Sequence, residues 1–152
     1  MLSATDIKLL GFTQTLELTT RDLYKFVVGR KSLSDDESQM LAQFHAHHVA
    51  YEQTINGLLG KNAVSARDEA MYVGFLQKLS ESPNVWTALL QIENSLITTH
   101  TKSIESIESA KVAAVIASMI TIEARHAAIL ATMTSTNLSL ALDNSESVLV
   151  VS

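Results

Sequence analysis

The scarcity of residues that interrupt helices is the feature that most constrains how this chain folds. Its 152 residues include one proline, Pro83, and five glycines. Proline and glycine are the strongest local breakers of regular structure, so their rarity favours long helices over many short strands. Before the last few residues, no stretch alternates apolar and polar side chains as a half-buried strand does. The sequence therefore predicts an all-α fold.

Two long helices are predicted in the first 60 residues. Over residues 5–28, apolar side chains recur at steps of three and four, the period of an amphipathic helix. Gly29 follows this pattern and is suited to the position beyond a helix C-terminus. A capping-box pattern at residues 34–37 starts the second helix. The inward line of this helix, meaning the row of residues that faces the predicted core, includes Phe44. The helix is expected to end at Gly60.

Two more long helices follow a polar connection over residues 61–84. A short apolar pattern within it, preceded by a cap at residues 65–68, predicts a short extra helix. Ser82 and Pro83 suit the N-cap and first position of the third long helix, which is expected to reach Glu108. A short turn leads into a fourth helix over residues 110–134, so these two should be antiparallel neighbours. An up-down four-helix bundle with one long crossover, between helices two and three, has ferritin-like connectivity.

The bundle is predicted to be one domain over residues 1–136, and residues 137–152 a C-terminal tail. The tail is apolar at residues 138–142 and again at 148–151, so it is expected to pack on the bundle or on a partner subunit. Charged residues make up 18% of the chain, below the usual quarter or so. We therefore expect a homodimer or a larger homo-oligomer.

Composition also excludes several classes of function. The net charge is −5 and Lys and Arg do not cluster, so no nucleic-acid partner is expected. The absence of cysteine excludes disulfides, thiolate metal sites and cysteine nucleophiles. The longest uncharged run, residues 127–142, is shorter than the roughly 20 apolar residues of a membrane span. The first ten residues lack a signal-peptide pattern, so a cytoplasmic protein without a membrane partner is expected.

Carboxylates interrupt the apolar faces of three predicted helices. Glu17 lies on the inward line of the first helix, Glu93 on that of the third and Glu123 on that of the fourth. Charged side chains are rarely buried unless they are paired or bind a metal. Three carboxylates in one core would repel one another without a cation. Oxygen ligands mixed with imidazole suit iron or manganese.

Glu123 and His126 strengthen the case for a metal. They are three residues apart, which places both on one face of the helix. A Glu-x-x-His pair, joined by single glutamates from other helices, is the ligand pattern of di-iron and di-manganese carboxylate bundles. In isolation, the alternative for such a pair is a solvated helix face.

The second predicted helix departs from that pattern. A symmetric two-metal site needs another Glu-x-x-His, but the inward line offers His48 and Tyr51 at that spacing. His48 is either a ligand or a core histidine, whereas Tyr51 is favoured as a core tyrosine bonded to a carboxylate. Glu52 would supply the missing oxygen if the helix is rotated slightly. His100, two turns after Glu93, is favoured as a core histidine held by hydrogen bonds, with a ligand or a ligand's partner as alternatives.

Several segments together resemble the ferritin-like domain proteins of bacteria, in the ferritin and rubrerythrin group. The similarity spans about residues 5–134 and is strongest at Ile122–Leu130 of the fourth helix. The other matching segments are Leu16–Tyr24, Phe44–Gly60 and Ile92–Asn94. The resemblance implies a dinuclear-metal bundle.

The ligand positions that the resemblance implies are Glu17, Glu93, Glu123 and His126. The family's usual acid and histidine on the second helix fall on His48 and Tyr51. That departure leaves open a single-ion site, an asymmetric pair of ions, zinc or copper instead of iron or manganese, or a bundle that has lost its metal function.

The function expected from these residues is metal binding coupled to oxygen or peroxide redox chemistry, of the ferroxidase, peroxidase or catalase-like kind. Two alternatives are a non-enzymatic metal-binding module and a metal-free interaction protein with a buried network of glutamate and histidine.

Overall fold

The computed structural model describes residues 2–81, 84–134 and 137–150, and their regular structure is helical. The α-helices are α1 (Ala4–Val28), α2 (Asp35–Leu59), α3 (Glu69–Glu81), α4 (Val85–Ile104) and α5 (Ala110–Met133), with 3₁₀ turns at Gly60–Asn62 and Leu140–Leu142. Within those described ranges no strand occurs. The predicted all-α bundle of four long helices, with a short extra helix in the crossover, is confirmed.

The described chain divides into two compact units. One contains residues 10–74, with most of α1, all of α2 and the start of α3. The other contains residues up to Leu9 and from Phe75 to Val150, with the rest of α3, both later helices and the tail.

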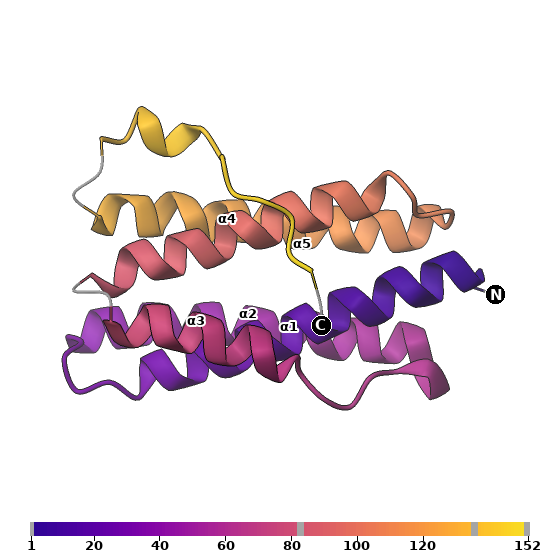
Figure 1. Ribbon diagram of the computed structural model, residues 1–152, viewed down its shortest axis with the longest axis horizontal. Helices are drawn as coiled ribbons and strands as arrows, with labels where there is room; N and C mark the ends of the chain where they lie inside the picture. The colour runs from indigo at the N-terminus through magenta and orange to yellow at the C-terminus, as the bar shows by residue number, and fades with distance from the viewer. Residues whose placement is uncertain (1, 82–83, 135–136, 151–152) are drawn as a thin grey trace. The chain divides into compact units, whose positions relative to one another are not determined.

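In the unit of residues 10–74, α1 and α2 form an antiparallel hairpin (Figure 1). The predicted capping box is present: Glu37 N–H donates to Ser34 Oγ at 3.3 Å, and Ser34 N–H donates to Glu37 Oε2 at 2.8 Å. At the other end of α2, Gly60 adopts a φ of 53°, which favours glycine. The largest side chains of this hairpin that are fully buried are Leu10, Leu16, Leu23, Tyr24, Leu41 and Ile55.

Asp68 fixes where α3 begins. Its Oδ1 accepts a hydrogen bond of 2.8 Å from Met71 N–H, which is the bond of an N-cap residue. Its own N–H donates to Thr19 Oγ1 on α1 at 3.2 Å. The cap predicted at residues 65–68 therefore both starts α3 and ties that start to α1.

Arg67 makes a second tie between the crossover and α1. Its Nη1 lies 2.8 Å from Asp22 Oδ2, and its Nε lies 2.9 Å from Glu69 Oε2. The guanidinium also stacks over the ring of Tyr72, at 3.4 Å from the ring centroid. Arg21 reaches the other oxygen of Asp22 at 2.9 Å, so one carboxylate binds two guanidinium groups.

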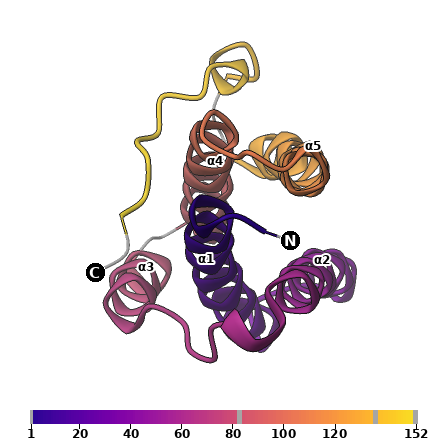
Figure 2. The ribbon, with the colours of Figure 1, turned by 90° about the vertical axis from the view of Figure 1, so that its right-hand side faces the viewer.

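In the other unit, α4 and α5 lie side by side as an antiparallel pair (Figures 1 and 2). Asn84 is the N-cap of α4, and its Oδ1 accepts from Trp86 N–H at 3.0 Å. The predicted start at Ser82 and Pro83 lies outside the described residues. Ser109 caps α5 in the same way, accepting from Val112 N–H at 3.4 Å.

The prediction that this third long helix reaches Glu108 is wrong, because α4 ends at Ile104. Tight turn bonds follow, including Ser106 N–H to Ser103 O at 3.1 Å. The N–H of Glu108 donates instead to Oδ1 of Asp6, a buried carboxylate near the start of α1, at 2.9 Å. Because the N–H of Glu108 is used in this bond, it makes no hydrogen bond within α4. Residues 105–109 instead form the turn that leads to α5.

The tail of the chain, yellow in Figure 1, runs across α4. Asn144 Nδ2 donates to the backbone oxygen of Asn94 at 2.9 Å, and Leu149 N–H donates to Thr99 Oγ1 at 2.9 Å.

The helix α5 is long and apolar enough to cross a membrane, judged by length and composition alone. Core helices of soluble proteins meet the same criterion. Within the most apolar window of α5, 33% is buried.

The ties around Asp22 predict a pH-dependent stability. Partial burial by itself raises the pKa of Asp22, but hydrogen bonds from Arg21 and Arg67 outweigh it and leave that pKa below its usual value. The ionised carboxylate therefore stabilises the fold above about pH 3.9, its unfolded value, and this stability is lost as pH falls through the lower folded pKa. We expect Asp22→Asn to lower the free energy of unfolding at pH 7 by about 0.5–1 kcal/mol, since the group is partly exposed.

Urea unfolding of both proteins at several pH values between about 7 and 3 tests this prediction. The free energies of unfolding of the parent protein and of Asp22→Asn should become equal near the lowest pH. Asp143→Asn removes an exposed carboxylate that makes no ion pair within the described part of the chain, and is the matched control. A deficit of Asp22→Asn that persists unchanged at low pH would contradict the electrostatic cause.

Candidate metal centre

The residues predicted as metal ligands are all buried. Their side chains come from α1, α2, α4 and α5, and none is more than 2% exposed: Glu17, His48, Glu93, Glu123 and His126. Fully buried carboxylates are rare in proteins, because removing the charge from water costs several kcal/mol unless a partner compensates. Each of these glutamates has a histidine beside it.

Glu17 and His48 form the pair within the α1–α2 hairpin. The Nδ1 of His48 lies 2.9 Å from Oε2 of Glu17, and both side chains are fully buried. His48 follows Phe44 by one helical turn, so it shares the apolar face of α2 that packs on α1. The sequence predicted that His48 is either a metal ligand or a core histidine. The structure places its ring in contact with the carboxylate of Glu17.

Tyr24 fixes the plane of the His48 ring. The two rings stack with centroids 5.1 Å apart and an interplanar angle of 24°. Phe44 meets the edge of Tyr24 at 6.1 Å and 74°. Aromatic contacts of this kind restrict ring rotation, so the imidazole can meet Glu17 in few orientations. The seven-residue step from Glu17 to Tyr24 shows a shared face, but no sequence pattern indicates the stacking.

Two more pairs join α4 to α5, and they are reciprocal. The Nδ1 of His126 on α5 lies 3.1 Å from Oε1 of Glu93 on α4. The Nδ1 of His100 on α4 lies 3.1 Å from the carboxylate oxygens of Glu123 on α5. Each helix thus contributes one glutamate and one histidine, and His100, favoured in the sequence as a hydrogen-bonded core residue, has Glu123 as its partner.

The two donor atoms within each pair are spaced as neighbouring ligands of one metal ion are. Ligand atoms bound at about 2.1 Å and about 90° to one another lie about 3 Å apart. The nitrogen-to-oxygen separations within the three pairs are 2.9, 3.1 and 3.1 Å. The same separation suits a hydrogen bond, so the pairs are arranged for either state. The buried glutamate and histidine groups of this chain could therefore bind a metal.

Two further residues of α2, Glu52 and Tyr51, were predicted to lie near the metal. Glu52 Oε1 accepts a hydrogen bond of 2.8 Å from Gln14 Nε2, and Gln14 in turn accepts one from Val64 N–H at 2.8 Å. This carboxylate therefore helps to hold the crossover against α1. Tyr51, favoured in the sequence as a core tyrosine, is half-buried, so the prediction of a core position is wrong.

His45, which follows Phe44 on α2, is also half-buried. Partial burial, together with the neighbouring His48, Arg21 and Lys25, lowers the pKa of His45. Its imidazole is therefore neutral at pH 7.

Comparison with models of known families finds a match over most of the chain. The model of a family described as a ferritin-like domain matches residues 5–136. No curated protein and no solved structure matches the chain. The matched residues contain all of the buried glutamates and histidines described above.

The pair of Glu93 and His126 predicts strong energetic coupling in the metal-free protein. Removing one partner leaves the other buried beside an apolar side chain, which costs about 3 kcal/mol. We expect Glu93→Leu and His126→Leu each to lower the free energy of unfolding by about this amount. The double variant should cost less than the sum by about 2 kcal/mol.

Chemical unfolding of the four proteins in chelator measures this coupling. Gln43 and His47 supply a matched control, because their side chains are also 3.1 Å apart but form a solvent-exposed hydrogen bond. Alanine substitutions there should couple by less than about 0.5 kcal/mol. Equal coupling in the two pairs would show that burial adds nothing to the interaction.

Proposed function

Because the chain belongs to the ferritin-like domain family, we propose that it binds iron or manganese through its buried glutamates and histidines. The carrying observation is the reciprocal arrangement on α4 and α5, where Glu93 meets His126 and Glu123 meets His100. Ferritin-like bundles build metal sites from inward-facing glutamates and Glu-x-x-His pairs. Glu123 and His126 form such a pair, and both are buried.

Stability alone is a weak reason for these residues. Replacing a buried ion pair by well-packed apolar side chains is often neutral or stabilising. Yet α4 and α5 place two carboxylates and two imidazoles in positions where no side chain is more than 2% exposed. A cation that binds there would compensate the cost of burying the carboxylates, which supports a role in metal binding.

The proposal gives each residue a distinct role. Glu93 and Glu123 would neutralise the charge of the ion, and His126 would supply a nitrogen ligand. His100 would hold the carboxylate of Glu123 in place, as partners of metal ligands commonly do. Glu17 and His48 offer a further carboxylate and imidazole on α1 and α2. This donor set suits iron or manganese, with zinc and copper as alternatives.

Metal content tests the proposal directly. Protein purified without chelator should contain one or two ions per chain by elemental analysis. Glu123→Ala should weaken the affinity for iron(II) or manganese(II) by at least about tenfold, whereas Glu81→Ala, which removes an exposed carboxylate at the end of α3, should not. Absence of stoichiometric metal, with equal affinities in both variants, would refute the proposal.

The pair on α1 and α2 calls for its own variants. If Glu17 and His48 are ligands, Glu17→Ala and His48→Ala should each reduce the bound metal or its affinity, as Glu123→Ala does. Titration of the protein with metal, measured by isothermal titration calorimetry, gives both the number of bound ions and their affinity. Unchanged binding in both variants would limit the ligands to α4 and α5.

Redox activity is the finer part of the proposal. A bound iron or manganese ion would supply reaction with dioxygen or peroxide. Protein loaded with iron(II) or manganese(II) should consume oxygen or peroxide faster than the free ion, and Glu123→Ala should abolish the difference. Stoichiometric metal without such consumption would identify a non-enzymatic metal-binding protein instead.

A metal-free network is the second candidate, and one observation favours it. Each buried glutamate already has a histidine within 2.9–3.1 Å, so the interior can be electrostatically balanced without an ion. In that case chelator should leave the midpoint of thermal unfolding unchanged. A metal protein should unfold at a lower temperature once its ion is removed.

A further inference from the structure

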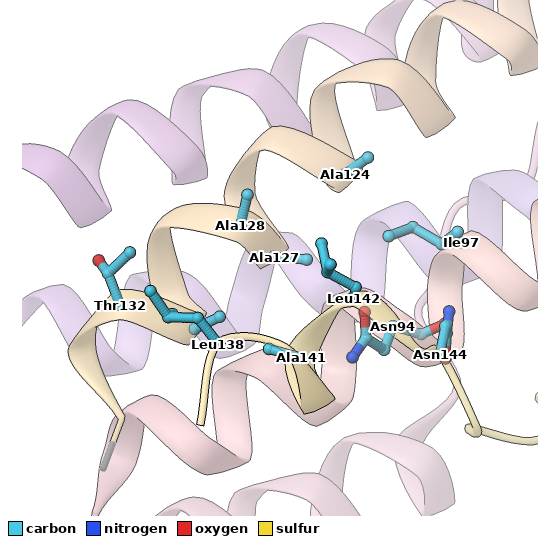
Figure 3. Close-up of a pocket in the computed structure, with 11 residues that line it drawn as sticks. Asn94, Ile97, Ala124, Ala127, Ala128, Thr132, Leu138, Ala141, Leu142 and Asn144 are labelled. Atoms are coloured by element: carbon cyan, nitrogen blue, oxygen red, sulfur yellow. The ribbon is translucent and has the colours of Figure 1, made fainter. Parts of the chain in front are cut away.

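A cavity of about 470 Å³ lies between α4, α5 and the tail (Figure 3), and the residues of the glutamate and histidine pairs are not among those that line it. Its volume falls in the range of small-molecule sites, about 300–1,000 Å³. The tail supplies one wall, with Leu138 and Leu142 still 57% and 85% exposed at the opening.

Small side chains on α5 create this space. The wall that α5 provides includes alanines at positions spaced as i, i+3, i+4 and i+7, which form one face of a helix: Ala124, Ala127, Ala128 and Ala131. Larger aliphatic residues at these positions would fill the volume against the tail. The tail forms the opposite wall and is bonded to α4 through Asn144 and Leu149, and the lining is mostly apolar.

The polar lining lies mainly at one end of the cavity. Figure 3 shows Asn94 and Asn144 beside each other, with Thr132 and Leu138 at the far end. Asn144 is fixed by two hydrogen bonds: its Nδ2 donates to Asn94 O at 2.9 Å, and its Oδ1 accepts from Glu146 N–H at 3.0 Å. Thr132 Oγ1 donates to its own helix, at Ile129 O.

Among the described residues that line the cavity, no side chain carries a charge. An ionised ligand would therefore lose hydration without gaining an opposite charge. An aliphatic ligand would instead remove apolar wall surface from water, including the exposed leucines of the tail. An amide such as that of Asn94 offers both a donor and an acceptor to an uncharged polar group.

We propose that this cavity binds a small neutral molecule with an aliphatic body and one hydrogen-bonding group, such as a medium-chain alcohol. The aliphatic body lies along the alanine face of α5, and the polar group lies at the asparagine end. None of the lining residues is a proposed metal ligand, so the test of this cavity does not depend on whether the protein binds metal.

Fluorescence titration with N-phenyl-1-naphthylamine, a neutral apolar probe, tests the site in the full-length protein. We expect saturable binding of one probe per chain. 1-Decanol should displace the probe, and decanoate should be at least about tenfold less effective because of its charge. Absence of saturable binding would overturn the proposal, and equal displacement by decanoate would overturn its neutral-ligand part.

Matched leucine variants locate the binding. Ala128→Leu places a larger side chain in the cavity and should weaken probe binding about tenfold. Ala117→Leu makes the same change on an exposed part of α5 that does not line the cavity, and should bind as the parent protein does. If circular dichroism shows that Ala128→Leu is unfolded, Ala124→Leu replaces it. Equal affinities in the lining and control variants would refute the site.

Discussion

The burial of carboxylates is the constraint on which the rest of the structure depends. Three glutamates lie in the interior with essentially no exposed surface, and each would oppose folding without a partner. A histidine from the neighbouring helix provides that partner within 3.1 Å in every case. The pairing therefore determines which faces of α1 and α2, and of α4 and α5, turn toward each other.

Helix length and turn geometry follow from the same requirement. Glu93 meets His126 and His100 meets Glu123 only if α4 and α5 keep one antiparallel register. The turn between them is held by Asp6, which accepts from Glu108 N–H and stops α4 at Ile104. A helix that continued to Glu108 would leave fewer residues for the turn before Ser109 caps α5. Local capping and long-range bonding thus support the same register.

Much of this arrangement could be predicted from the sequence, because it depends on local patterns. Periodicity and caps located the helices, and glutamates on apolar faces indicated the buried carboxylates. The end of α4 could not be predicted, since the bond of Glu108 to Asp6 joins residues far apart in the chain. The partner of each histidine depends on small helix rotations that a period of 3.6 residues does not fix. The cavity under the tail depends on how the tail docks, which no local pattern encodes.

The same pairs that balance the interior also bear on how many ions it would accept. Di-metal carboxylate bundles use four glutamates and two histidines, whereas the ligands proposed here include three glutamates, because His48 occupies the position of an acid. Of these, the two glutamates on α4 and α5 match the charge of one divalent ion. A second divalent ion beside them would leave an uncompensated positive charge in an apolar core, which is costly. We therefore propose one divalent ion on α4 and α5, rather than the two that the family pattern implies.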